Sequence, residues 1–104
     1  MNTIMQGDQY ILPIMLTDSA GNVVTADDVE DVEITIGGII KTYAKDEILW
    51  DGESYWGFPM SQDESFAFPP RIKCQARAKF NGGDIIGVAI TTLSVVASES
   101  KERL

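Results

Sequence analysis

Apolar and polar side chains alternate with a period of two along most of this chain. In Val32–Ile36 (VEITI) three aliphatic residues share one side of an extended strand, and Glu33 and Thr35 take the other. Arg71–Phe80 repeats the pattern, with apolar or small residues at even positions and bases or glutamine at odd positions. Because successive side chains of a strand point to opposite faces, this period predicts half-buried strands.

Three further segments are predicted to be strands. Gln9–Leu16 is a short apolar run in which Pro13, lacking an N–H, favours an edge strand or a bulge. Ile39–Tyr43 follows Gly37-Gly38, a pair suited to a tight hairpin. Ile85–Val96 is expected to be the longest strand, and its nearly continuous apolar residues predict cover on both sides of part of it.

A second hairpin is predicted from Glu47–Trp50 and Ser54–Met60, with two possible registers. A three-residue loop pairs Ile48 with Trp56 and puts the apolar residues Trp50, Phe58 and Met60 on the same face. A two-residue loop sets Ile48 opposite Tyr55 and moves Trp56 to the other side. Since one face is expected to be buried, we prefer the first register, in which Tyr55 faces out.

Two single helical turns complete the predicted elements. Thr25 is placed as the N-cap of the first, and Ser61 with Glu64 forms a capping box for the second. We therefore predict an all-β fold, an antiparallel immunoglobulin-like β-sandwich of six or seven strands, with a small barrel as the alternative. The domain is expected to span residues 1–97, and the polar tail 98–104 to fray or dock elsewhere.

The composition fits one globular domain and narrows the possible chemistry. The chain has 104 residues, 44% of them apolar, one cysteine and no histidine. Without histidine, Ser-His-Asp and Cys-His sites and the common zinc sites are excluded. Cys74 falls on the inward side of its strand, which predicts a buried, inert thiol. No apolar stretch is long enough for a membrane helix, and the start lacks the features of a signal peptide.

Other candidate sites are weaker still. The acidic run from Asp27 to Glu33 lacks the spacing of a calcium loop and is interpreted as a solvated edge. The carboxylate pairs Asp46/Glu47 and Asp51/Glu53 lie at strand ends, where no cleft is predicted. A Ser–Lys dyad would require Lys41, Lys45 or Lys73 beside a serine. We therefore expect no enzyme activity and no catalytic, cofactor or metal site.

Charge is distributed unevenly along the chain. The net charge is −8, and residues 1–40 carry seven acids and no base. This balance argues against nucleic-acid binding, which depends on Lys and Arg. Four of the eight bases face one side of the 71–80 strand, either as a wet sheet face paired with neighbouring acids or as a contact surface. The candidate partner-contact residues are Arg71, Lys73, Arg77, Lys79 and Tyr55.

The order of strands and turns resembles a family of phage proteins. The relevant segments are "GDQYILPIMLTDSAGNVV", "VEITIG", "EILWDGESYWGFPMSQDES", "KCQARAKFNGGDIIG" and "SESKERL". They are similar to the N-terminal domain of phage baseplate upper proteins and to small standalone prophage proteins of Gram-positive bacteria. The resemblance implies a non-enzymatic structural or adaptor protein of a virion or tail, made in the bacterial cytoplasm. It also implies protein partners and a possible homo-oligomer. No nucleic-acid partner is expected from the charge balance, and no membrane partner from the lack of a membrane segment.

The alternative function is a carbohydrate-binding or adhesion module built on the same sandwich. Such a module needs aromatic rings that face solvent. Trp50, Tyr55 and Trp56 cluster around one hairpin and are the candidates, although the preferred register places both tryptophans in the core.

Overall fold

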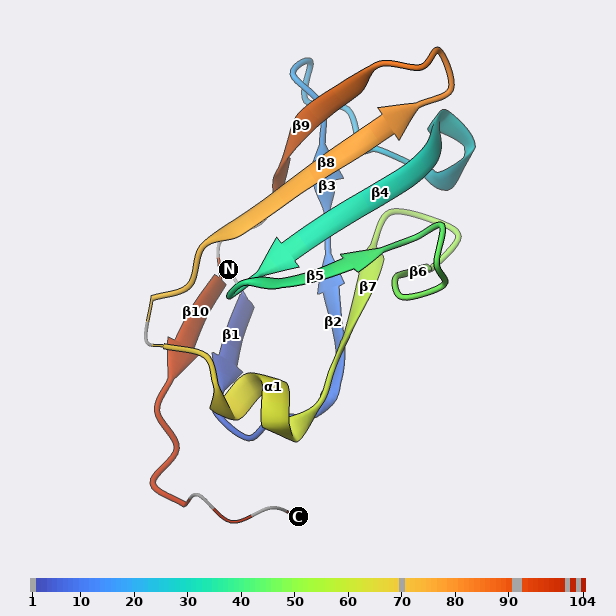
Figure 1. Ribbon diagram of the computed structural model, residues 1–104. Coiled ribbons are helices and arrows are strands. Elements are labelled where there is room, and N and C mark those ends of the chain that lie inside the picture. Colours follow the sequence, from blue (N-terminus) through green and yellow to red (C-terminus); the bar gives the residue numbers. More distant parts are fainter. Residues whose placement is uncertain (1, 70, 91–92, 101, 103) are drawn as a thin grey trace.

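The computed structural model describes residues 2–69, 71–90, 93–100, 102 and 104, and its regular elements are mostly β-strands (Figure 1). Two short helices are η1 (Ala26–Asp28) and α1 (Gln62–Phe66). The described residues hold ten strands: β1 (Asn2–Met5), β2 (Tyr10–Ile14), β3 (Leu16–Thr17), β4 (Val29–Ile36), β5 (Ile39–Thr42), β6 (Leu49–Trp50), β7 (Trp56–Met60), β8 (Cys74–Phe80), β9 (Ile85–Ile90) and β10 (Leu93–Val96). The predicted all-β character and the two helical turns are confirmed.

The described strands form three sheets. A five-stranded sheet has the order β3-β9-β8-β4-β5, a three-stranded sheet has the order β2-β7-β6, and β1 pairs with β10. All pairings are antiparallel except β1–β10, which is parallel. Strands β2 and β3 are separated by one residue, so the chain passes directly from one antiparallel sheet to the other (Figure 1).

One hydrophobic core is shared by these sheets. The predicted alternation in β4 is confirmed, since Val32, Ile34 and Ile36 are fully buried and the residues between them are half-buried. The three-stranded sheet contributes Trp56 and Phe58, also fully buried. The Trp56 indole N–H donates to the carbonyl of Val24 over 2.9 Å, so this large side chain is buried with its polar group satisfied.

The strand count exceeds the predicted six or seven because two apolar segments are interrupted and because β1 was not predicted. Gln9–Leu16 contains β2 and the first residue of β3, and β2 is an edge strand of its sheet, as Pro13 predicted. The prediction that Ile85–Val96 is the longest strand is wrong, because β9 has 6 residues and β4 has 8. Residues 91–92 lie outside the described part.

Much of β9 is also less covered than its apolar sequence predicted. Ile85 and Ile86 are 64% and 50% exposed. The neighbouring strand β3 has only two residues, and these pair with Ala89 and Ile90 at the end of β9. The first half of β9 therefore has a hydrogen-bonded neighbour on one side only, β8.

The predicted register of the second hairpin is wrong, although its faces are right. Trp50 pairs with Trp56, and Leu49 with Gly57, so the loop between the strands has five residues, Asp51–Tyr55. The observed register differs from the preferred one by two positions, and such a shift leaves every side chain on the same face. Trp56, Phe58 and Met60 are buried as predicted, and Trp50 packs against the core.

Candidate functional site

The basic face of β8 divides into a paired half and an unpaired half. Arg77 lies opposite Glu33 of β4 and donates to its carboxylate through Nε at 3.0 Å and Nη2 at 2.7 Å. The Lys79 ammonium lies 3.4 Å from the Glu30 carboxylate. For these two bases, the pairing with acids of a neighbouring strand is confirmed.

Arg71 and Lys73 lie just before β8 and differ from the other two bases. Both side chains are exposed, and neither forms an ion pair with the described residues. Ile72 between them is half-buried and packs against the core. The carbonyl of Lys73 accepts a hydrogen bond from the Gly37 N–H, which ties this segment to the β4–β5 hairpin. We call Arg71–Lys73 the basic segment.

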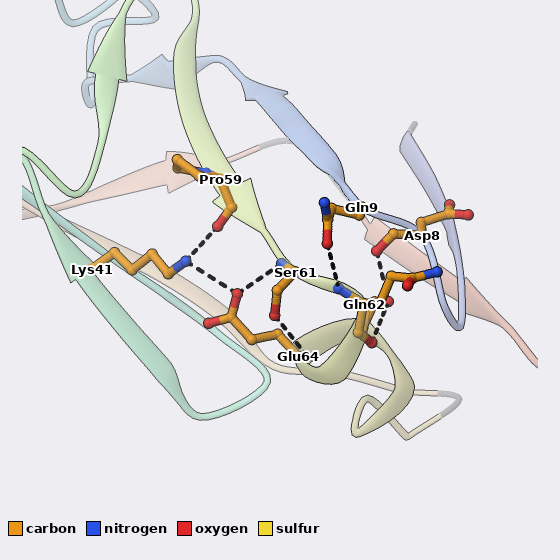
Figure 2. A network of polar contacts seen from close by, with 8 residues as sticks. Asp8, Gln9, Lys41, Pro59, Ser61, Gln62 and Glu64 are labelled. Atoms are coloured by element: carbon orange, nitrogen blue, oxygen red, sulfur yellow. Dashed lines mark hydrogen bonds and ion pairs between the residues drawn. The ribbon is translucent and has the colours of Figure 1, made fainter. Parts of the chain in front are cut away.

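A polar network joins α1 to both antiparallel sheets (Figure 2). Lys41 is in register with Ile34, so it lies on the inner face of its sheet. Its ammonium donates to the Glu64 carboxylate at 3.2 Å and to the Pro59 carbonyl, and lies 4.9 Å from the centre of the Phe58 ring. Burial raises the pKa of Glu64, but bonds from the Ser61 N–H and from Lys41 bring this pKa below its ordinary value.

This network bears on the Ser–Lys hypothesis, because Lys41 and Ser61 line one cavity of about 510 Å³. The Ser61 hydroxyl accepts the Glu64 N–H at 3.1 Å and so acts as the N-cap of α1. Lys41 donates to the Glu64 carboxylate and the Pro59 carbonyl. The Lys41 and Ser61 side chains are therefore both engaged in contacts that hold the fold together. The geometry accounts for Lys41 and Ser61 as structural residues.

The same helix holds the segment between β1 and β2. The Ser65 hydroxyl, fully buried, accepts the Gly7 N–H at 2.9 Å and donates to the Asp8 carbonyl at 2.8 Å. The Gln62 side chain donates to the Gly7 carbonyl. The Gln62 backbone N–H donates to the Gln9 side chain (Figure 2). The polar network therefore fixes α1 against the β1–β2 segment on one side and against Lys41 of β5 on the other.

The outer face of the three-stranded sheet carries an apolar groove of about 330 Å³. Its exposed apolar side chains include Ile11 at 53%, Leu49 at 47% and Tyr55 at 41%. Leu12 and Ile14 of β2 face the core, so Ile11 and Pro13 face outward beside Leu49. We call this surface the β6 groove, and its lining residues are Ile11, Pro13, Leu49, Trp50, Asp51, Tyr55 and Gly57.

Gly57 keeps the floor of this groove low. A Cβ atom at Gly57 would lie 2.6 Å from Cγ2 of Ile11 and 3.6 Å from Cβ of Leu49. Any larger residue would therefore push the Ile11 side chain into the space now open. Glycine at this position allows the two exposed aliphatic residues to flank a hollow.

Asp51 is the one charged residue in the groove lining. Its Oδ1 atom accepts the backbone N–H groups of Glu53, Ser54 and Tyr55 at 2.7, 2.9 and 3.1 Å. These bonds, the Glu53 one foremost, lower the pKa of the Asp51 carboxyl against a smaller opposing effect of burial. The Oδ2 atom accepts no hydrogen bond from the described residues, so it remains available to a ligand.

The predicted contact residues do not form one surface. Tyr55 faces outward as predicted, but it lies in the loop that joins β6 to β7, and Figure 1 shows β6 on the right. The segment leading from α1 into β8, which holds Arg71 and Lys73, runs along the left side. Ile11 and Leu49 were missed by the sequence reasoning. Each is an apolar residue at an outward position of its strand. That position could have indicated an exposed apolar surface, but both residues were interpreted only as members of apolar runs.

The candidate aromatic platform is mostly internal. Trp56 is fully buried, and the Trp50 ring packs against it with centroids 4.8 Å apart. The Tyr43 and Trp56 rings form a T-shaped pair with centroids 5.1 Å apart. Among the hairpin aromatics, Tyr55 and part of Trp50 therefore remain to meet a ligand in the β6 groove.

Cys74 is a half-buried free thiol, and burial raises its pKa. The described residues contain no group of three or more histidine, cysteine, aspartate or glutamate side chains placed to hold a metal ion. Within the same residues, no helix is long and apolar enough to cross a membrane.

Comparisons with protein-family models, with curated proteins and with solved structures find no match to this chain. Its surfaces are therefore the observations that bear on its function.

Proposed function

We propose that this chain is a non-enzymatic structural or adaptor protein of a phage or prophage particle, of the baseplate or tail type. It works through protein–protein contacts on an immunoglobulin-like β-sandwich. The observation that carries the proposal is the β6 groove, an exposed apolar hollow on the sheet face that points away from the core. Contiguous exposed apolar surface of this kind is typical of interaction sites.

The arrangement of polar residues supports a contact function rather than catalysis. The buried serine, Ser65, bonds to backbone groups of the β1–β2 segment. Lys41 and Glu64 connect α1 to both antiparallel sheets. A catalytic site requires a reactive group within hydrogen-bonding reach of its base and of a space for substrate. In the polar network, the Ser65 hydroxyl and the Lys41 and Glu64 side chains instead form hydrogen bonds within the protein.

The assignment to a phage particle rests on the resemblance of the strand and turn segments to baseplate upper proteins. The ten strands, short helices and tight hairpins are compatible with a building block of that kind. In addition to the groove, which Tyr55 lines, the proposed contact regions are the basic segment and the tail from Ser98 to Leu104, of which residues 101 and 103 lie outside the described part. Arg77 and Lys79 are weaker candidates, because acids of β4 already neutralise them.

Particles purified from an induced lysogen that encodes this chain provide the test. We expect the wild-type chain in the particles at a fixed ratio to the other components. Leu49→Asp places a charge in the β6 groove and should remove the chain from particles. Ile40→Asp is the matched control, because Ile40 is 59% exposed on β5, away from the groove lining. Absence of the wild-type chain from intact particles would contradict the proposal.

Carbohydrate binding is a second candidate, favoured by one observation. Trp50, Tyr55 and the Asp51 carboxylate line the same groove, which combines aromatic rings with an oriented acceptor. The full burial of Trp56 removes one of the three candidate rings. Titration of the labelled protein with cell-wall oligosaccharides would support this candidate if the Tyr55 and Asp51 amide signals shift and the shifts vanish in Tyr55→Ala.

A further inference from the structure

The β6 groove has the dimensions and chemistry of a site for one or two side chains. Its volume of about 330 Å³ lies at the lower end of the range for ligand pockets, about 300 to 1,000 Å³. Its walls are aliphatic and aromatic, and its single charge is the Asp51 carboxylate. A fitting occupant carries a cation on an apolar stem, as Arg and Lys do.

The same chain presents such an occupant on another surface. Arg71 and Lys73 are exposed and unpaired within the described residues, whereas Arg77 and Lys79 have carboxylate partners. Lys45 is also exposed and unpaired there, but it lies between Ala44 and Asp46 in a turn, beside an acid of its own. The basic segment is thus the one place in the described chain where two unpaired bases lie two residues apart.

The two surfaces cannot meet within one molecule. Cys74, next to the basic segment, pairs with Ile36 at the end of β4. The groove lies instead on the outer face of the other antiparallel sheet, and Figure 1 shows β6 and the approach to β8 on opposite sides. A contact between them must therefore join two copies. Because the surfaces lie on opposite sides, one partner cannot fill both, so the contact repeats head to tail and builds a ring or filament.

We propose that the β6 groove of one copy binds the basic segment of the next. The Asp51 Oδ2 atom accepts a hydrogen bond from Arg71 or Lys73, whose stem lies against the Tyr55 and Leu49 side chains. A guanidinium over Tyr55 adds a cation–π contact. This inference rests on the proposed function, since it names a second copy as the partner of the same groove.

The net charge of −8 opposes self-association in general but not this contact in particular. At physiological salt the Debye length is about 8 Å, so charges on distant parts of two copies are screened. A close pair partly shielded by apolar side chains is screened much less. Self-association should consequently persist at moderate salt, where non-specific attraction between charges weakens.

Sedimentation velocity over a range of protein concentrations, with a complementation step, tests the contact. Wild-type protein should show concentration-dependent growth beyond a dimer. Leu49→Glu, which blocks the groove, and the double variant Arg71→Glu/Lys73→Glu should each be monomeric. An equimolar mixture of these two variants should form dimers that grow no further, because one intact groove and one intact basic segment remain. Lys45→Glu and Ile40→Glu are the matched controls and should associate like wild type.

Asp51→Asn gives a milder variant, because an amide oxygen can still accept the three loop N–H bonds. It should weaken association by about tenfold, as expected for loss of one charge-assisted hydrogen bond. Circular dichroism of each variant establishes that it is folded.

Monomeric wild-type protein at every concentration, or association that survives in both blocked variants, overturns the self-contact. These outcomes are separable from failure of the proposed function. If the chain is monomeric alone but present in particles and lost with Leu49→Asp, the groove takes another virion protein. If it self-associates as described but is absent from particles, only the particle assignment fails.

Discussion

The Asp51 carboxylate determines the conformation of the loop between β6 and β7. One oxygen accepts three consecutive backbone N–H groups, from Glu53, Ser54 and Tyr55. Such multiple bonding is how a short polar side chain replaces a backbone acceptor in a turn. It also fixes the position of Tyr55, the exposed aromatic residue of the β6 groove.

Asp51 predicts a dependence of stability on pH. Its pKa is lower in the folded protein than the ordinary value of about 3.9. The stabilisation it provides is therefore complete above that value and is lost as the pH falls through the lower folded pKa. Urea unfolding midpoints, measured from about pH 6 to about pH 2, should fall less steeply for Asp51→Asn than for wild type. Equal slopes would show that the three hydrogen bonds do not favour the charged form.

At the scale of elements, the β4–β5 hairpin shows how a turn is adapted to its neighbours. Gly37 and Gly38 have φ angles of 58° and 85°, in the region that glycine adopts without strain. A Cβ atom at Gly37 would lie 2.7 Å from the buried Phe68 ring, whereas one at Gly38 would have nothing within 4 Å. Gly37 is thus required both by its positive φ angle and by the nearby Phe68 ring, whereas Gly38 is required by its positive φ angle alone.

These two glycines provide a matched pair of substitutions. Gly38→Ala should lower the free energy of unfolding by about 1 kcal/mol or somewhat more, the cost of a positive φ angle. Gly37→Ala should cost about 1–3 kcal/mol beyond that, because overpacking displaces the Phe68 ring. Urea denaturation at neutral pH measures both. Equal losses in the two variants would mean that the ring moves aside freely.

Local patterns explain which elements the sequence could predict. The alternation in β4 and β8, the Gly37-Gly38 turn and the Ser61–Glu64 cap all depend on residues within a few positions of one another. The register of β6 and β7 does not, because a shift by two positions leaves the same residues buried. The five-residue loop depends instead on the hydrogen bonds of one aspartate, which no periodicity reveals.

The candidate site was less predictable than the strands, for a similar reason. The odd positions of the four bases predicted that they face outward. Which of them form ion pairs with acids depends on the pairing of β8 with β4. Predicting the β6 groove would have required knowledge of which strands lie beside β2, because Ile11 and Leu49 are distant in sequence. Only the assembled sheet brings them together around Gly57.

At the scale of the whole molecule, Lys41 and Glu64 link the two antiparallel sheets through α1. Both side chains are mostly buried, at 17% and 28% exposure, and the ammonium also contacts Pro59 and Phe58. The Lys79–Glu30 pair is about half exposed and lies on the outer face of one sheet. Exposed pairs contribute little to stability, whereas networks that are partly buried contribute more.

Double-mutant cycles with Lys→Met and Glu→Gln should separate these two pairs. The coupling energy between Lys41 and Glu64 is expected to be about 1 kcal/mol, within the range for contacting residues. For Lys79 and Glu30 it should be near zero and vanish in high salt. Equal coupling energies in the two cycles would remove the argument that the Lys41 network holds the sheets together.

The parallel pairing of β1 with β10 also has a consequence for biosynthesis. Thr3 and Ser94 bond across this pair although they are 91 positions apart. At about 5–20 residues per second, the ribosome needs roughly 5–20 s to make the intervening chain. Throughout that interval Ile4, which is fully inaccessible in the finished protein, has no strand to lie beside. The nascent polypeptide therefore leaves the apolar side chain of Ile4 without its β10 neighbour until Val95 has been translated.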